Sequence, residues 1–400
     1  MQTLVSPAEN VMKGLLEQFK PCFSKPQFKN FSTYTMGIIA YEGKKTVDAI
    51  NRCFLDAKNQ SSLNRFLTHS PWSLQRLEAK RLALARTNLP APQGSTGTLI
   101  IDDTINRKTG KHMEEAGYHY DSADRKAVWG HDLVTTHYVN GETEYPLRLN
   151  LYVKRETCLN EGRVFKTKIE LACEQIAAYT PPTGTRTVVA FDSWYFCRQV
   201  TEAAAARGYD WVTQAESNRI VHVNGDEMNV TELAKSLPGK NFKVVKVRGE
   251  VHSLCGVEAW MPRAGDVKLV VAWEEDGFHF YVSNRVDWTA KQVLEAYKVR
   301  QSIEVFYRDA KQSLGLEAYQ MRRGRGAIIH CHLAFNAYTL LALLRRSVCC
   351  RSKLLGRRLT TLGDVCRWVR DQCFRRLVDW IYLRFRHQAK PETIYRRLKI

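Results

Sequence analysis

The spacing of apolar residues divides the chain into a helical beginning, a mixed middle and a helical end. In residues 1–88, apolar side chains recur every three or four positions, which predicts amphipathic helices. The three predicted helices are Val11–Phe19, Thr46–Lys58 and Trp72–Arg86. Residues 87–97 are rich in Pro, Gly, Ser and Thr, so we predict a linker before the middle region begins.

Short apolar runs replace the helical spacing after residue 97. Two of them, Thr98–Ile101 and Thr187–Phe191, predict buried strands that are followed directly by the acids Asp102-Asp103 and Asp192. The other predicted elements up to residue 215 are a hairpin of Ala127–Tyr138 and Tyr145–Val153 with its turn at Asn140-Gly141, helices at 163–178 and 194–207, and a strand at Tyr209–Thr213. This order predicts a mixed sheet flanked by helices, which is an α/β arrangement.

Residues 216–287 have a different pattern, with short strands separated by turn signals such as Asn224-Gly225 and Arg248-Gly249. The predicted strands are Arg219–Val223, Phe242–Val247, Val267–Trp273 and Phe278–Ser283, with one helix around Val230–Leu237. We interpret this block as a β-rich insertion. Helical spacing resumes at Thr289 and continues to the C-terminus.

Charge is unevenly distributed and favours a polyanionic partner. The net charge is +19, of which residues 1–90 carry +7 and residues 321–400 carry +15, while residues 91–320 carry −3. Two basic ends around a nearly neutral middle indicate an enzyme that holds a nucleic-acid backbone at its edges. An acidic protein or a membrane surface is the alternative, but the basic C-terminal residues alternate with aromatic ones as in packed helices.

Neither a membrane protein nor a secreted protein is expected. The longest apolar run, Cys331–Leu344, is too short to span a bilayer and predicts a buried helix. No basic segment followed by an apolar one marks the N-terminus, so we expect a cytoplasmic protein. The eleven cysteines contain no CxxC pair and indicate reduced, mostly buried thiols. His330-Cys331-His332 and Cys349-Cys350 lack the ligand spacing of a zinc site.

The acids that follow the two buried strands are candidate metal ligands. Sites in open α/β sheets form at the carboxyl ends of strands, where Asp102 and Asp192 are predicted to lie. Hydrolysis of a phosphodiester by two Mg²⁺ ions needs several carboxylate oxygens, so a third acid is expected from a nearby helix. The predicted helix 289–314 offers one, Glu304.

Four polar residues of that helix lie in one stripe. Tyr297, Arg300, Glu304 and Lys311 fall within about 60° of each other at ~100° per residue. Such a stripe suits a phosphate with a metal beside it, because Arg and Lys hold phosphate oxygens and Glu coordinates the ion. A solvated helix face with an Arg300–Glu304 ion pair is the alternative that spacing alone leaves open.

The spacing Y-x2-R-x3-E-x6-K of these four residues resembles the YREK signature of bacterial cut-and-paste insertion-sequence transposases. Those enzymes are DDE transposases with a ribonuclease-H-like core. The strings LIIDDT and VAFDSW are similar to the strands that carry the first and second aspartates of that family, and the motifs occur in the family's order. The resemblance covers about residues 98–345, with the β-rich insertion between the second aspartate and the glutamate.

The resemblance implies site residues, cofactor and partners. Asp102, Asp192 and Glu304 would bind two Mg²⁺ ions, which Mn²⁺ is expected to replace, and the family pattern favours Asp102 over its neighbour Asp103. Tyr297, Arg300 and Lys311 would contact the DNA end. The partners would be double-stranded DNA, as terminal inverted repeats and as target, and a second copy of the chain.

Three further residues are weaker candidates for DNA contacts. Trp288 could stack on a displaced base, although packing of the insertion against the core is the simpler interpretation. Arg322 and Arg323 in the MRRGRG segment could bind phosphates, or could belong to a solvated loop.

These observations predict a DNA transposase that cleaves the ends of an element and joins the 3′ hydroxyl to target DNA. The alternatives are an endonuclease without strand transfer and a repressor that binds DNA without chemistry. The predicted domains are a helical DNA-binding domain at 1–90, a ribonuclease-H-like core at 91–215 and 288–345, the β-rich insertion at 216–287, and a basic helical region at 346–400.

Overall fold

A computed structural model describes residues 12–55, 59–349 and 359–398. The chain forms two compact units, which are treated separately below. The helical unit comprises Met1–Pro90, Ile105–His131 and Phe306–Ile400, and the sheet unit comprises Ala91–Thr104 and Asp132–Val305.

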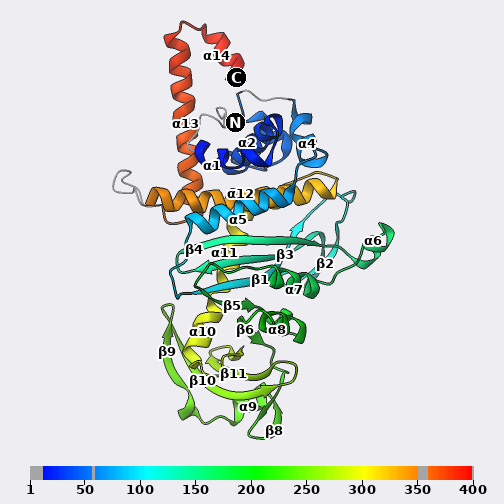
Figure 1. The fold of residues 1–400 in the computed structure, drawn as a ribbon, viewed down its shortest axis with the longest axis vertical. Helices are drawn as coiled ribbons and strands as arrows, with labels where there is room; N and C mark the ends of the chain where they lie inside the picture. The colour runs from blue at the N-terminus through cyan, green and yellow to red at the C-terminus, as the bar shows by residue number, and fades with distance from the viewer. Residues whose placement is uncertain (1–11, 56–58, 350–358, 399–400) are drawn as a thin grey trace. The chain divides into compact units, whose positions relative to one another are not determined.

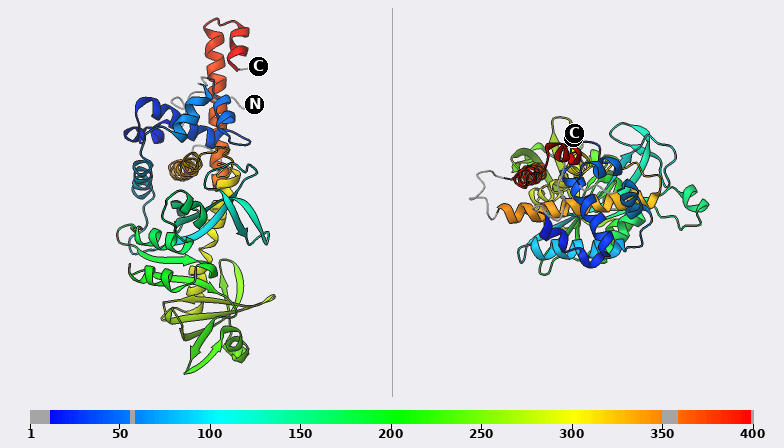
Figure 2. Two further views of the ribbon diagram at one scale, coloured as in Figure 1. Left: turned by 90° about the vertical axis from the view of Figure 1, so that its right-hand side faces the viewer. Right: turned by 90° about the horizontal axis from the view of Figure 1, so that it is seen from above.

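The helical unit is built around one long apolar helix, α12, which contacts α2, α4, α5 and α13 (Figure 1). Figure 2 shows α13 extending away from α12 toward the short final helix. The helices are α1 (Lys13–Glu17), η2 (Lys20–Cys22), α2 (Lys25–Ala40), α3 (Val47–Arg52), α4 (Gln60–Thr68), α5 (Leu74–Asn88), α12 (Gly324–Cys349), α13 (Leu362–Arg386) and α14 (Pro391–Leu398).

The apolar run at Cys331–Leu344 lies inside α12, as predicted. Among the described residues, the segment Gly324–Ser347 of this helix has the length and composition of a membrane span, but 94% of its apolar window is buried inside the structure. It therefore has the character of a core helix. Nine cysteines whose side chains the structure describes are free thiols, seven of them buried and two half-buried.

Two helices of this unit, α2 and α4, were not predicted from the apolar spacing. In α2, nine residues between Phe31 and Ala40 are buried. A helix that is buried on most sides has no polar face, and so lacks the periodic signal of an amphipathic helix. The predicted helices 11–19, 46–58 and 72–86 correspond to α1, α3 and α5, although their predicted limits at Val11 and Lys58 lie outside the described residues.

Within the described residues, the strands form one mixed sheet of 12 strands. Its order is β2-β3-β1-β5-β6-β12-β11-β10-β7-β8, with β4 beside β3 and β9 beside β10. The strands are β1 (Thr96–Arg107), β2 (Gly117–Asp121), β3 (Lys126–Asn140), β4 (Thr143–Tyr152), β5 (Arg186–Phe191), β6 (Asp210–Ala215), β7 (Ile220–Val223), β8 (Asp226–Asn229), β9 (Lys243–Val247), β10 (Glu250–Met261), β11 (Gly265–Glu274) and β12 (Gly277–Ser283). Parallel pairing of β1 with β5 and of β5 with β6 forms the centre of the sheet.

The predicted β-rich block continues this sheet through an antiparallel pairing of β12 with β6. Its turns at Asn224-Gly225 and Arg248-Gly249 were predicted correctly, and both Asn224 and Arg248 have positive φ angles, of 54° and 49°. Two strands, β8 and β10, were not predicted. In β10 the alternation of buried and exposed positions is irregular and Gly256 interrupts the strand pattern, which weakens the signal.

Helices flank the strands of the sheet unit: α7 contacts β4, α8 contacts β6, and α10 contacts β6 and β9–β12 (Figure 1). The helices are α6 (Arg155–Asn160), α7 (Lys168–Ala177), η3 (Ser193–Tyr195), α8 (Arg198–Ala205), α9 (Val230–Ser236), η4 (Gly239–Asn241), α10 (Ala290–Lys298) and α11 (Gln301–Gln312). The predicted α/β class is confirmed, and the mixed sheet with flanking helices is consistent with a ribonuclease-H-like fold.

The prediction of one continuous helix over 289–314 was wrong. The segment forms α10 and α11, which are separated by Val299 and Arg300. At the break, the backbone N–H of Arg300 donates to the carbonyl of Tyr297 at 2.9 Å, so the hydrogen bond spans three residues instead of four. This tighter turn sets the direction from which Arg300 and Glu304 leave the backbone.

Candidate active site

Asp102 and Asp192 lie on neighbouring parallel strands of the sheet unit. Ile100 pairs with Ala190, so Asp102 within β1 and Asp192 directly after β5 are each two residues beyond this pair. The structure differs from the prediction in one respect, because β1 does not end at Ile101 but continues through Asp102 and Asp103 to Arg107. Alternation along the strand therefore directs these two neighbouring acids differently.

Asp192 follows the last residue of β5 and caps the short helix η3. Its Oδ1 accepts hydrogen bonds from the backbone N–H groups of Trp194 at 3.1 Å and Tyr195 at 3.2 Å. Both of these hydrogen bonds end on Oδ1, and neither involves Oδ2. The cap thus holds the carboxylate in one orientation at the end of the strand.

Arg300 joins Asp102 to Glu304. Its Nη1 donates to Oδ2 of Asp102 at 3.1 Å, and its Nη2 donates to Oε1 of Glu304 at 2.6 Å. The side chains of Arg300 and Asp102 are each 16% exposed, whereas that of Glu304 is 56% exposed. The Arg300–Glu304 ion pair named as the alternative to a functional stripe is present, but the same guanidinium also reaches the acid on β1.

The carboxylates repel one another in a poorly solvated site. Burial raises the pKa of Asp102 to about 7; Arg300 opposes this rise, and the charges of Asp192 and Asp103 add to it. Burial also raises the pKa of Asp192. Burial is the main cause of both raised pKa values, and the positive charge of Arg300 opposes it at both acids.

A second charge cluster holds Asp103. The Lys168 ammonium lies 2.7 Å from Oδ2 of Asp103 and 2.6 Å from Oδ2 of the fully buried Asp132. The Tyr195 hydroxyl donates to Oδ1 of Asp103 at 2.9 Å. Burial and the neighbouring Asp103 raise the pKa of Asp132 to about 7. Both oxygens of Asp103 are therefore occupied by groups of the protein.

Sequence reasoning did not identify Lys168, Asp132 or Tyr195. Tyr195 connects the two clusters, because its backbone N–H contacts Asp192 and its hydroxyl contacts Asp103. The adjacent Trp194 is 55% exposed, and the Lys168 ammonium lies 5.4 Å from the centroid of its ring. The aromatic pair Trp194-Tyr195, which follows Asp192 after one serine in VAFDSWY, was the sequence signal that could have identified Tyr195.

The other residues predicted to contact DNA are divided between the two units of the structure. The Tyr297 hydroxyl donates to Oε1 of Gln214 on β6 at 3.1 Å, and its side chain is buried. The half-buried Trp288 lies under the Arg285 guanidinium, 5.3 Å from the ring centroid. Both residues belong to the sheet unit together with Asp102, Asp192, Arg300 and Glu304.

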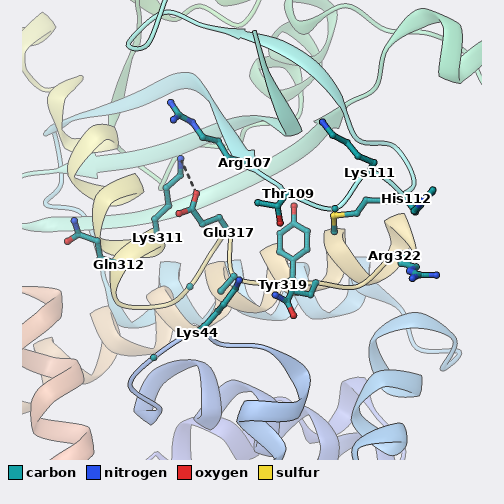
Figure 3. Close-up of a pocket in the computed structure, with 16 residues that line it drawn as sticks. Lys44, Arg107, Thr109, Lys111, His112, Lys311, Gln312, Glu317, Tyr319 and Arg322 are labelled. Carbon is teal, nitrogen blue, oxygen red and sulfur yellow. Dashed lines mark ion pairs between the residues drawn. The ribbon is translucent and has the colours of Figure 1, made fainter. Parts of the chain in front are cut away.

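Lys311 and Arg322 lie in the helical unit, where they line a pocket of about 580 Å³ (Figure 3). Further basic side chains on its wall come from Lys44, Arg107, Lys111 and His112, against the acid Glu317. Lys311 donates to the carbonyl of Ile105 at 3.0 Å, and burial lowers the pKa of its ammonium. Arg323 lines a neighbouring hollow of about 470 Å³ together with Arg322.

The chemistry of the predicted ligands fits Mg²⁺. Asp102, Asp192 and Glu304 offer only carboxylate oxygens, which this hard cation prefers. In the part of the chain that the structure describes, however, the three acids do not bring their oxygens within 4.8 Å of one another, a criterion met only by Glu274, Asp276 and His279. Arg300 instead occupies the space between Asp102 and Glu304, as a cation that neutralises both.

The family described as DDE superfamily endonuclease matches residues 18–257, which is more than half of the chain and includes Asp102 and Asp192 but not Glu304. The chain is also 32% identical over 145 residues to the probable transposase for insertion sequence element IS701 of Microchaete diplosiphon. That similarity covers 36% of this chain and 37% of the relative.

Proposed function

We propose that this chain, which belongs to the DDE superfamily endonucleases, is the transposase of an insertion sequence and cleaves DNA at the ends of that element. The observation that carries the proposal is the guanidinium of Arg300 between Asp102 and Glu304, beside Asp192 on the adjoining parallel strand. The similarity to a probable insertion-sequence transposase supports the same conclusion for part of the chain.

Asp102, Asp192 and Glu304 would hold two Mg²⁺ ions, and Mn²⁺ would replace them. When bound, such a pair supplies activation of the attacking oxygen and stabilisation of the leaving oxygen in an in-line displacement at phosphorus. Asp192 contributes a carboxylate whose orientation is fixed by its two backbone hydrogen bonds. Glu304 is the most exposed of the three acids, so it has the freedom to adjust to the bound ion.

We assign the metal to Asp102 and a structural role to Asp103. Asp103 has Lys168 on one oxygen and Tyr195 on the other, so binding an ion would cost both contacts. Asp102 shares its only side-chain cation with Glu304, and the register of β1 and β5 sets it level with Asp192. The family resemblance favours the same residue.

Arg300 has two roles in this proposal. In the free chain it neutralises Asp102 and Glu304, and with DNA bound its planar guanidinium holds oxygens of the phosphate that is cut. The ring centroid of Tyr297 lies 4.9 Å from that of Tyr281. From this position Tyr297 would contact the end of the bound DNA strand. With Glu304, these residues would act as the corresponding part of the YREK group of a cut-and-paste transposase, and Lys311 would contact DNA from the helical unit.

The helical unit would bind the flanking DNA. Its 580 Å³ pocket carries several basic side chains and one acid, so it attracts phosphate groups (Figure 3).

A homodimer is proposed because two ends of an element must be cut and joined together. The exposed apolar side chains of α13 support such contact, since Phe374, Val378 and Tyr382 recur every four residues on one face of the helix.

A strand-transfer assay tests the proposal. Duplexes that carry an end of the element would be incubated with the purified chain, target plasmid and Mg²⁺. A transposase yields both cut ends and joined products, an endonuclease yields cut ends alone, and a repressor yields only a shifted complex. Absence of cutting in Mg²⁺ and in Mn²⁺ would contradict the proposed function.

A further inference from the structure

A group of metal-ligating side chains lies in the sheet unit where β11 turns into β12. Nε2 of His279 lies 2.9 Å from Oδ1 of Asp276 and 3.9 Å from Oε2 of Glu274. Ligand atoms of all three residues lie within 4.8 Å of one another. Two bonds of about 2.0 Å at a tetrahedral angle separate ligand atoms by roughly 3.3 Å, so the two distances bracket the value for a zinc-class ion.

The strand register explains why these residues meet. His279 pairs with Ala272, and Glu274 is two residues further along β11, so both side chains lie on the same face as diagonal neighbours. Asp276 lies in the two-residue turn between Glu274 and Gly277, which returns the chain directly onto β12. The group is therefore held by a tight hairpin and needs no long loop to order.

A buried histidine lies behind the group. His252 of β10 is 5% exposed, and its Nδ1 lies 3.0 Å from Oε1 of Glu274. Its Nε2 lies 3.5 Å from Oε2 of Glu250, on the side of the ring away from Glu274. The imidazole therefore lies between two carboxylates and fixes the position of Glu274.

The side chains open onto solvent through a groove. A hollow of about 980 Å³ is lined by Glu250, His252, Glu274 and Asp276, with Trp273 on its wall. With Glu275, the hollow is lined by four carboxylates and one imidazole at the edge of the ligand group. The His279 side chain is itself 29% exposed, so an ion can reach it from solution without any rearrangement of the strands.

We propose that Glu274, Asp276 and His279 bind a divalent transition-metal ion of the zinc class. Imidazole nitrogen favours such ions over Mg²⁺, and three protein ligands leave one position for water or for a partner's side chain. The Nδ1–H of His252 donates to Glu274 and orients its carboxylate toward the ion. The site differs in ligands and in place from Asp102, Asp192 and Glu304, and it does not depend on the proposed DNA chemistry.

The ion would link the turn to both of its strands. Three bonds from the ion to Glu274, Asp276 and His279 would replace the hydrogen bond between His279 and Asp276. Because the folded hairpin binds the ion and the unfolded chain binds it weakly, the ion stabilises this part of the sheet. The expected consequence is a rise of the unfolding temperature on addition of Zn²⁺.

Titration of the full chain with Zn²⁺ in excess Mg²⁺ tests the proposal by calorimetry. Mg²⁺ occupies carboxylate sites, so the remaining Zn²⁺ binding reports sites with nitrogen or sulfur ligands. We expect saturable binding that weakens at least 10-fold in Asp276→Asn and His279→Ala. The matched control is His222→Ala, because His222 also lies beside a carboxylate, Glu227 at 3.5 Å, but outside the group.

Two further measurements make the outcome decisive. The Co²⁺-loaded chain should show no thiolate-to-metal absorption, which excludes the cysteines as ligands. Zn²⁺ binding should persist in Glu304→Gln, which separates this site from the proposed catalytic one. Unchanged Zn²⁺ affinity in both Asp276→Asn and His279→Ala, with unfolding curves that show folded variants, would overturn the proposal, as would the absence of saturable binding. If His279→Ala does not fold, His279→Gln takes its place.

Discussion

Arg300 donates to Asp102 across 198 residues of sequence, with Nη1 of the arginine 3.1 Å from Oδ2 of the aspartate. The same side chain holds Glu304, so one guanidinium connects the strand β1 with the start of α11. The charges of Asp102, Asp192 and Glu304, which are distant in the sequence, all interact with that of Arg300. Its consequences can be measured without DNA as well as with it.

Arg300→Ala should destabilise the metal-free chain and abolish efficient cleavage. Removing one partner of a largely buried ion pair leaves Asp102 without its cation, at a cost of about 3 kcal/mol. Added Mg²⁺ should restore most of this loss, because it supplies positive charge to the same acids. Urea unfolding with and without Mg²⁺ measures the effect. Equal losses in both conditions would show that Arg300 acts by packing alone.

The contribution of Asp102 to the stability of the metal-free chain should fall as the pH rises from about 4 to about 7. The pKa of Asp102 is raised to about 7, so between its ordinary value and 7 the folded chain binds a proton that the unfolded chain has released. Above pH 7 both states are ionised and the dependence ends. Mg²⁺ affinity should rise over the same range, because binding requires the ionised carboxylate.

Asp102→Asn isolates this contribution from that of Asp132, whose pKa is also raised to about 7. Urea unfolding of the variant between pH 5 and pH 8 should show a smaller pH dependence than the unsubstituted chain. If stability depended on pH identically in both proteins, Asp102 would not be the cause of that dependence.

Lys168→Ala should be strongly destabilising, because it leaves Asp103 and the buried Asp132 without their shared cation. The expected loss is about 3–5 kcal/mol. Lys166→Ala is the matched control: Lys166 pairs with Glu174 at 2.6 Å, but both side chains are about half exposed, and the loss should stay below about 1 kcal/mol. Similar losses for the two variants would contradict the assignment of a structural role to the Asp103 cluster.

Arg322→Ala should weaken DNA binding to all sequences by a similar factor. A phosphate contact contributes through release of counterions, so the slope of log affinity against log salt should decrease by about 1. Arg308, which is 59% exposed on α11 and does not line the pocket, provides the control. Fluorescence anisotropy at several salt concentrations measures both slopes. An unchanged slope in Arg322→Ala would exclude the pocket from the DNA interface.

The sequence predicted the acidic strands well because of how parallel strands are buried. The apolar run Thr187–Phe191 differs from β5 by one residue at its start, and Thr98–Ile101 lies within β1. Strands buried on both faces form continuous apolar runs, so their presence could be recognised, although β1 continues past Ile101 to Arg107. Helical spacing placed Glu304 on a helix, and the structure has it on α11.

Other features could not be predicted because they depend on contacts between distant residues. The helical spacing continues without Gly or Pro through Val299 and Arg300, so nothing local indicates the break between α10 and α11. Lys168 lies 65 residues from Asp103, and no motif connects them. In β10, Gly256 weakens the strand pattern, but a Cβ there would lie 3.3 Å from that of Ala290, so the glycine serves the approach of α10.

The cleavage rate of Glu304→Gln tests whether the Glu304 carboxylate is needed for catalysis. The comparison is with Glu295→Gln, because Glu295 also forms an exposed i,i+4 ion pair with a basic residue, Lys291, on α10. With an end-containing duplex and Mg²⁺, Glu304→Gln should cut at least ~1,000-fold more slowly while binding the duplex normally, a loss of about 4 kcal/mol of transition-state stabilisation. Glu295→Gln should cut at the normal rate. Cutting by Glu304→Gln at the rate of the unsubstituted chain would contradict the account.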